Sequence, residues 1–330
     1  MANDVADAER QVPEAAVAAV GISVDDLTAL YRLESIRGFG PQKFKQLAVA
    51  GVSCTEVVAD PARLPFRGRI GQSIDAQLRA QTDADVATIR GRAVRQILAA
   101  MRHEARIVTY PSGSYPQHLF ESNNAVPALF VRGNTDVLGI HTAVACVGSR
   151  QIRPPYDELH SEFARRASGQ GFVIVSGFAL GADSIGHRAA LESGGATICV
   201  MPGGLDRPFP PENRQLWDDL LRYPNACFVS EFAFGLRAAA LTLRKRNKLI
   251  AAFSSGVLVS QTARSGGAMN AVRFAVEQRK PISTFAPDSS GATDGNEAVA
   301  NLEGADITVF NLEKNRAEWD SWIARLSSST

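Results

Sequence analysis

The length, composition and charge of the chain exclude several classes of protein. Its 330 residues, of which 45% are hydrophobic and 21% charged, suffice for a large core and are ordinary for a globular protein. The formal net charge of +1 excludes a uniformly basic nucleic-acid binder, but it permits a basic patch that acidic surface elsewhere balances.

The cysteines and the first residues indicate a protein that stays in a reducing compartment. Cys54, Cys146, Cys199 and Cys227 are widely spaced and form no CxxC pair, which predicts free thiols rather than disulfides or metal ligands. Residues 1–20 lack the basic start of a signal peptide, and no apolar run reaches the ~18 residues of a membrane span. We therefore expect a cytoplasmic protein without membrane contact, metal or cofactor.

The first third of the chain predicts helices. Residues 1–21 predict a mobile tail or a loosely docked helix, and residues 22–104 predict a small all-helical domain. Within that domain, Gly38-Phe39-Gly40-Pro41 precedes a helical segment, which is the pattern of a helix-hairpin-helix turn as in SAM-like domains. In such a turn Gly38 and Gly40 permit the bend, and free amides beside Lys43 can meet a phosphate. Many small domains use the same turn only to pack two helices, so both interpretations stay open.

From Arg106 onward, short apolar strands alternate with helices. Strands are expected at 106–110, 128–133, 143–147, 172–175, 197–201, 227–230, 257–260 and 281–285. Helices are expected near 155–169, 183–193, 212–222, 244–253 and 267–278. This alternation predicts an α/β fold with an open parallel sheet and right-handed crossovers. Residues 311–330 predict one short packed helix that contains Trp319 and Trp322.

Glycine and serine gather where four of the predicted strands end. The four loops are Gly148-Ser149-Arg150, residues 176–183, residues 201–204 and residues 264–267. Because parallel sheets bind ligands at the carboxyl ends of their strands, we expect one floor of amides and hydroxyls for a phosphate-bearing ligand. An ordinary tight turn is the alternative for any single loop. Asp183 is expected to cap a helix, and His187, four residues on, to make a local surface contact.

The segment from Phe232 to Val276 contains no acidic residue. Its seven basic residues are Arg237, Arg244, Lys245, Arg246, Lys248, Arg264 and Arg273. Segregated positive charge of this kind predicts a polyphosphate partner, although a solvated helix face could explain any one of these side chains. No HExxH, GxSxG or Walker pattern is present, so we expect no catalytic residues.

Motifs in unbroken order along residues 105–306 resemble the DprA/Smf family of DNA-processing proteins, and the helical domain before them also fits. They include Tyr115-Pro116, Pro127–Asn134, Val147–Arg150, Val175–Asp183, Phe209–Asn213 and Arg246–Ala251. The resemblance implies an extended Rossmann-like domain with helices on both faces of the sheet. It also implies a homodimer that binds single-stranded DNA, protects incoming DNA and loads a RecA-type recombinase during natural transformation and recombination.

The resemblance also implies which residues bind DNA. It assigns to the pocket Gly148, Ser149, Arg150, Ser176, Gly177, Arg246, Asn247, Lys248, Ser265 and Gly266. The acid-free segment adds Arg244, Lys245 and Arg264. Residues 307–330 are expected to be a short C-terminal segment without the winged helix that many members carry.

The sequence departs from the family pattern at three places, which together comprise four residues. Leu243-Arg244 replaces a common Phe-Pro pair, Leu180 replaces an arginine, and Gln261 replaces an acid. Loss of the aromatic ring removes a stacking platform that is worth about 1–3 kcal/mol per base. Arg244 and Lys245 could offset this loss electrostatically, which would make binding more dependent on salt.

Two other functions compete with DNA binding. The same crevice could serve a sensor of a nucleotide-like small ligand. An enzyme that cleaves a glycosidic bond, as in related phosphoribohydrolases, is the other alternative, because Pro202-Gly203-Gly204 begins their motif. Leu205 and Asp206 then break that motif, and its catalytic glutamate is missing, so we expect no enzyme.

Overall fold

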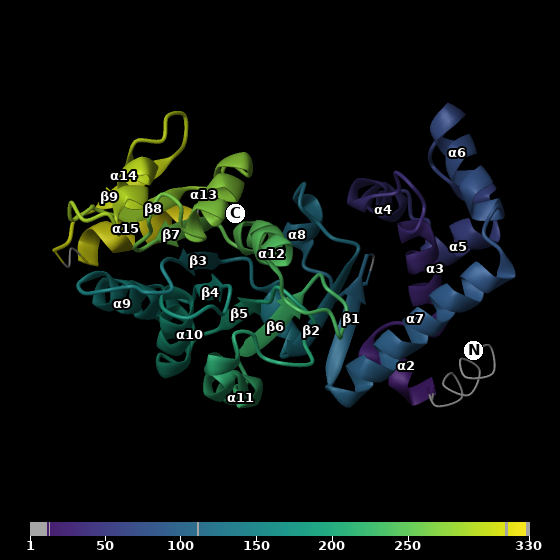
Figure 1. Ribbon diagram of the computed structural model, residues 1–330, viewed down its shortest axis with the longest axis horizontal. Coiled ribbons are helices and arrows are strands. Elements are labelled where there is room, and N and C mark those ends of the chain that lie inside the picture. The colour runs from purple at the N-terminus through teal and green to yellow at the C-terminus, as the bar shows by residue number, and fades with distance from the viewer. Residues whose placement is uncertain (1–11, 13, 111, 314–315, 328–330) are drawn as a thin grey trace. The chain divides into compact units, whose positions relative to one another are not determined.

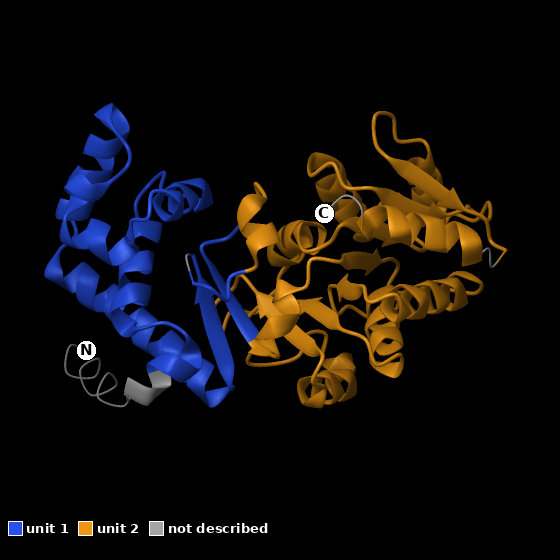
Figure 2. Cartoon of the chain, turned by 180° about the vertical axis from the view of Figure 1, so that it is seen from behind, with its two compact units in different colours: residues 1–115, 125–131 blue, residues 116–124, 132–330 orange. Residues whose placement is uncertain are grey.

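The computed structural model describes residues 12, 14–110, 112–313 and 316–327, and the chain divides into two compact units. Unit 1 comprises residues 1–115 and 125–131, and unit 2 comprises residues 116–124 and 132–330 (Figure 2).

Unit 1 is mainly helical, with local sequence signals at its helix starts. Its helices are α2 (Glu14–Val20), α3 (Val24–Glu34), α4 (Pro41–Val49), α5 (Cys54–Ala59), α6 (Gly68–Arg79) and α7 (Asp83–Arg102), followed by the strand β1 (Ala105–Thr109). Ser53 with Glu56 and Thr82 with Asp85 form capping boxes that satisfy the first amides of α5 and α7. Of the predicted tail, residues 1–11 and 13 lie outside the described residues, and Glu14–Val20 are helical.

The predicted helix-hairpin-helix turn lies between α3 and α4. Gly38 has φ of +82°, Gly40 is the N-cap of α4, and Pro41 begins the helix. The Lys43 ammonium donates to the Gly38 carbonyl at 2.7 Å. Phe39 is buried with its ring 4.9 Å from that of Phe44. The turn thus packs two helices, and phosphate binding there stays a prediction.

The strands β3 to β9 of unit 2 form a parallel sheet in the order β6-β5-β4-β3-β7-β8-β9. They are β3 (Ala143–Val147), β4 (Val173–Ser176), β5 (Thr197–Val200), β6 (Ala226–Ser230), β7 (Gly256–Val259), β8 (Ile282–Phe285) and β9 (Ile307–Phe310). Except for β9 at the edge, every one of their residues is buried, as continuous apolar runs predict for a parallel sheet covered on both faces. The strand β9 was not predicted. A further strand, β2 (Ala128–Gly133), was predicted with these bounds.

Helices cover both faces of the unit 2 strands, which confirms the predicted fold class. Figure 1 shows α9 (Tyr156–Gly169), α10 (Ala182–Glu192) and α11 (Arg214–Arg222) on one side, and α12 (Ala240–Ala252) and α13 (Ala268–Glu277) on the other. The α12 helix begins four residues before its predicted start. The short helices α8 (Gln117–Glu121) and α14 (Asp294–Ala300) were not predicted.

The predicted packed helix with two tryptophans is confirmed as α15 (Arg316–Ser327), which packs on α9. Trp319 and Trp322 are buried in the same cluster as Phe163 and Phe310. Within the described part of the chain, each helix is too short or too polar to span a bilayer.

Candidate nucleic-acid interface

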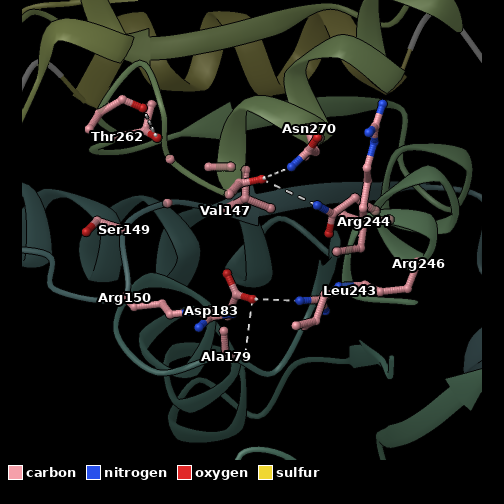
Figure 3. A pocket seen from close by; sticks show the side chains of 18 of the residues that line it. Val147, Ser149, Arg150, Ala179, Asp183, Leu243, Arg244, Arg246, Thr262 and Asn270 are labelled. Carbon is pink, nitrogen blue, oxygen red and sulfur yellow. Dashed lines mark hydrogen bonds and ion pairs between the residues drawn. The ribbon is translucent and has the colours of Figure 1, made fainter. Parts of the chain in front are cut away.

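A pocket of about 580 Å³ lies at the carboxyl ends of β3, β4 and β7 (Figure 3). The chain runs from β3 through β4 and β5 to β6 on one side, and then crosses to place β7 on the other side of β3. The pocket therefore lies at the topological switch, where open parallel sheets bind their ligands. We call it the strand-end pocket.

The loop after β3 is held tightly in place. A Cβ atom at Gly148 would lie 2.5 Å from Ser260 Oγ and 2.8 Å from Ala182 Cβ, so only glycine fits. The amide of Ser149 donates to the Gln261 carbonyl at 2.7 Å, and the Ser149 carbonyl accepts from the Ala182 amide at 3.1 Å. Arg150, which follows, is exposed and lines the pocket. Backbone contacts thus fix the loop and leave the guanidinium group at the pocket.

Three helices begin at the strand-end pocket. Asp183 in the first turn of α10, Ala240 at the start of α12 and Ala268 at the start of α13 all line it. The first amides of a helix have no partner within the helix and carry the positive end of its dipole. Three such ends at one pocket favour an anion.

Arg246 of α12 is the most enclosed cation of the site. Its side chain is 6% exposed, and Nη1 donates to the Val200 carbonyl at 2.8 Å. A Cβ atom at Gly177 would lie 1.5 Å from Nη1, so the guanidinium group fills the space that this glycine leaves. Among the described residues, nothing accepts a hydrogen bond from Arg246 Nε. A buried donor without an acceptor is costly, so Arg246 is held in place at the expense of stability.

Asp183 is the acidic residue that faces this arginine. Its Oδ2 atom lies 3.9 Å from Arg246 Nη2 and accepts from the Ala179 amide at 3.2 Å. Burial raises the pKa of Asp183 and lowers that of Arg246, and each charge opposes the shift of the other. The expectation that Asp183 caps a helix is wrong, because Gly181 is the N-cap of α10 and the carboxylate binds the preceding loop.

His187 is not the surface contact that we expected. It is fully buried, with Nδ1 2.7 Å from Thr197 Oγ1. Burial, followed by the charges of Arg246 and His160, lowers its pKa to about 3. The neutral imidazole therefore packs beneath the site. In the described ranges, no group of three His, Cys, Asp or Glu residues could hold a metal ion.

The structure brings seven of the predicted DNA-binding residues to the strand-end pocket. They are Gly148, Ser149, Arg150, Arg244, Arg246, Asn247 and Gly266. Gly177 lies behind Arg246, as described above. Thr262 and Asn270 also line the pocket and were not predicted. Asn270 lies in the first turn of α13, so the expected start of that helix could have indicated it. Asn247 and Asn270 both donate to the Gly267 carbonyl, at 3.4 and 3.3 Å.

Besides Gly177, five predicted residues do not line the pocket: Ser176, Lys245, Lys248, Arg264 and Ser265. Ser176 is fully buried, and its hydroxyl donates to the Cys146 carbonyl at 2.6 Å. Lys245 instead lies 3.2 Å from a carboxylate oxygen of Glu231.

The expectation that four loops form one floor is wrong for the loop after β5. Residues 201–204 are buried and do not line the pocket. The Gly204 amide donates to the Leu236 carbonyl at 2.9 Å, and a Cβ atom at Gly203 would lie 2.7 Å from that oxygen. These glycines permit close backbone packing between two loops, which the sequence does not distinguish from contact with a phosphate.

Comparisons with known proteins agree on one family. Residues 106–313 match the family described as DNA recombination-mediator protein A. Protein Smf of Synechocystis sp. is 31% identical over 62% of this chain and 52% of that protein. DNA processing protein DprA of Streptococcus pneumoniae is 30% identical over 72% of this chain and 86% of that protein. The chain spans about half the length of its Smf relatives, including that of Escherichia coli at 46%.

Solved structures show the same fold. The X-ray structure of DprA from Streptococcus pneumoniae matches with a TM-score of 0.68 and 23% identity, over 90% of this chain and 98% of that chain. A structure that describes the single-stranded DNA binding mode of DNA processing protein A from Helicobacter pylori matches with a TM-score of 0.58 and 24% identity, over 66% and 96%. With its motifs, its fold and more than half of its residues matched, the chain belongs to the DprA/Smf family of DNA-processing proteins.

Proposed function

We propose that the strand-end pocket binds the backbone of single-stranded DNA and that the protein performs no catalysis there. The observation that carries the proposal is the enclosed guanidinium group of Arg246, which lies at the topological switch of the sheet. Arg150, Arg244 and three helix N-termini surround the same space. A phosphate group would bring negative charge and hydrogen-bond acceptors into the space that these cations and helix ends surround.

The concave shape of the site favours a single strand over a duplex. A pocket of about 580 Å³ has the size of a small-molecule site, into which one nucleotide of a flexible strand can turn. A phosphate of a rigid duplex brings its neighbours and the second strand with it. The relative from Helicobacter pylori, whose structure describes a single-stranded DNA binding mode, supports the same choice.

Fluorescence anisotropy with a labelled dT12 oligonucleotide tests the proposal. We expect binding that weakens as salt rises, and we expect Arg150→Ala and Arg246→Ala to weaken it further. The control is Arg188→Ala, because Arg188 is exposed on α10, does not line the pocket and carries the same charge. Absence of binding at 50 mM salt, or equal affinities of the Arg150→Ala and Arg188→Ala variants, would contradict the proposal.

A sensor of a nucleotide-like ligand is the second candidate, and the single-molecule size of the pocket favours it. Thermal-shift measurements with mononucleotides and with oligonucleotides of increasing length separate the two functions. A sensor reaches its full stabilisation with one nucleotide, whereas a strand binder gains with each added nucleotide until its footprint is filled.

The RecA-type recombinase, the homodimer and the role in natural transformation are proposed from family membership alone. The test is whether the protein speeds assembly of a RecA-type recombinase on an oligonucleotide that a single-strand-binding protein covers. Light scattering of the purified protein gives its oligomeric state. No acceleration together with a monomeric mass would reject both proposals.

A further inference from the structure

One segment beside the strand-end pocket exposes both apolar and cationic side chains. It comprises residues 235–241, which we call the rim segment. Leu236 is 47% exposed and Leu241 is 74% exposed. Arg237 is exposed and has no ion-pair partner among the described residues, and neither has Arg244 one turn into α12. Two exposed leucines and an unpaired arginine on one short segment, with a second unpaired arginine close behind it in the chain, suggest a surface that a ligand covers.

The backbone of the rim segment is fixed at several points. The Leu236 carbonyl accepts from the Gly204 amide at 2.9 Å, and the Gly235 amide donates to Asp206 Oδ1 at 2.9 Å. At its other end, the Ala239 amide donates to Thr242 Oγ1 at 2.9 Å. The exposed side chains therefore project from a held backbone, which lowers the entropy that a ligand must overcome.

The rim segment is continuous with the strand-end pocket. Ala240, Leu243, Arg244 and Asn247 line the pocket, and their spacing places them on one face of α12. Leu241 lies one residue and about 100° further round the helix, outside the pocket. Arg237 precedes the helix by three residues. A strand that leaves the pocket past Ala240 thus meets these side chains next.

We infer that the rim segment binds the nucleotides that flank the one held in the strand-end pocket. Arg237 contacts a phosphate, and Leu241 covers the apolar face of a base. This inference rests on the proposed function, because it takes single-stranded DNA as the ligand of the pocket. Charge favours a polyanion as the occupant, since no acidic residue occurs from 232 to 276.

Oligonucleotides of two lengths distinguish the rim segment from the pocket. We would measure the affinities of 5′-phosphorylated dT2 by calorimetry and of dT12 by anisotropy, the latter over a series of salt concentrations. Arg237→Ala is expected to weaken dT12 by about threefold to tenfold and to reduce the salt slope by about 0.7, as for one lost phosphate contact. Leu241→Ser is expected to weaken dT12 by about twofold to fivefold without a change in slope. Both variants should bind dT2 as the wild type does.

Two controls keep the result interpretable. Arg188→Ala, which removes an equal charge from α10, should change neither affinity by more than about twofold. Arg150→Ala should weaken both ligands, since Arg150 lines the pocket itself. Because Arg237 and Leu241 are exposed, their variants should also keep the wild-type melting temperature.

The outcomes separate the two proposals. If Arg150→Ala weakens both ligands while Arg237→Ala and Leu241→Ser match Arg188→Ala on dT12, the rim segment binds no DNA and this inference is overturned. The same follows if the two rim variants weaken dT2 as much as dT12, since the segment would then act on the pocket. Failure of the wild-type protein to bind dT12 overturns the proposed function, and this inference with it.

Discussion

Substitution of Gly177 by alanine tests how tightly the structure confines Arg246. The added Cβ atom would lie 1.5 Å from Arg246 Nη1 and 2.0 Å from Cζ, so the guanidinium group must leave its place. The group is buried and donates to the Val200 carbonyl at 2.8 Å, which limits where it can move. We expect the variant to lose that hydrogen bond.

The size of the effect follows from the lost bond. A hydrogen bond from a charged donor contributes about 1.5–3 kcal/mol, and strain at the crowded position adds to the loss. We therefore expect the free energy of unfolding to fall by about 2–3 kcal/mol. For a unit of this size, that corresponds to a melting temperature lower by about 4–12 °C. Affinity for dT12 should fall as well, because the displaced arginine no longer meets a phosphate in the same way.

The assay is thermal unfolding with Gly169→Ala as the matched control. Gly169 ends α9, and a Cβ atom there meets nothing within 4 Å, so the same substitution should leave stability unchanged or slightly raised. A double-mutant cycle with Arg246→Ala then tests the cause. In the Arg246→Ala background, Gly177→Ala should cost little, since the atom it collides with is gone. Equal costs in both backgrounds, or a wild-type melting temperature for Gly177→Ala alone, would refute the reasoning.

Three further predictions concern other parts of unit 2. Burial lowers the pKa of His160 to about 4, so the native state keeps it neutral while the unfolded chain takes up a proton below about pH 6.5. Stability should therefore fall as pH drops from 6.5 toward 4. In urea unfolding, the His160→Leu variant should lose about 1.4 kcal/mol less per pH unit than the wild type, and an equal loss in both proteins would contradict this. Trp319→Ala should lower the free energy of unfolding by about 3–5 kcal/mol, because the ring is fully buried, and a loss below about 1 kcal/mol would count against that packing. Lys245→Ala should weaken dT12 less than Arg244→Ala does, since Lys245 already pairs with Glu231, and equal losses in anisotropy would show otherwise.

The sheet and its helices could be predicted because their sequence signals are strong and local. Runs such as Ala143–Val147 and Gly256–Val259 are buried on both faces, so each reads as one short apolar stretch. The strand β9 was missed because it lies at the sheet edge and is not continuously buried: Ile307 and Thr308 are half-buried and Val309 is exposed. Its pairing with β8 is a long-range contact that no local pattern reveals.

The site was harder to predict, because side-chain direction decides it. Arg244, Lys245 and Arg246 follow one another on α12, and each is rotated by about 100° from the last, so all three cannot face one pocket equally. The sequence identified the basic run, but it did not show which of the three side chains face the pocket. In the structure, Arg244 and Arg246 line the pocket and Lys245 does not. Side-chain direction also decided the outcome for Ser176, which ends a strand. Because both faces of the sheet are covered, its small polar side chain is buried in the core instead of facing the pocket.

Asp183 has a consequence for the rates of binding and release. When the pocket is empty, its carboxylate is the counter-ion that Arg246 faces at 3.9 Å. If the strand-end pocket binds DNA as proposed, an incoming phosphate competes with an anion that is already present, and its gain is the difference between two interactions with the same guanidinium group. When such a phosphate departs, Asp183 is still present as the counter-ion of Arg246. Under the proposed function, such an arrangement would speed dissociation and would suit a protein that exchanges its ligand.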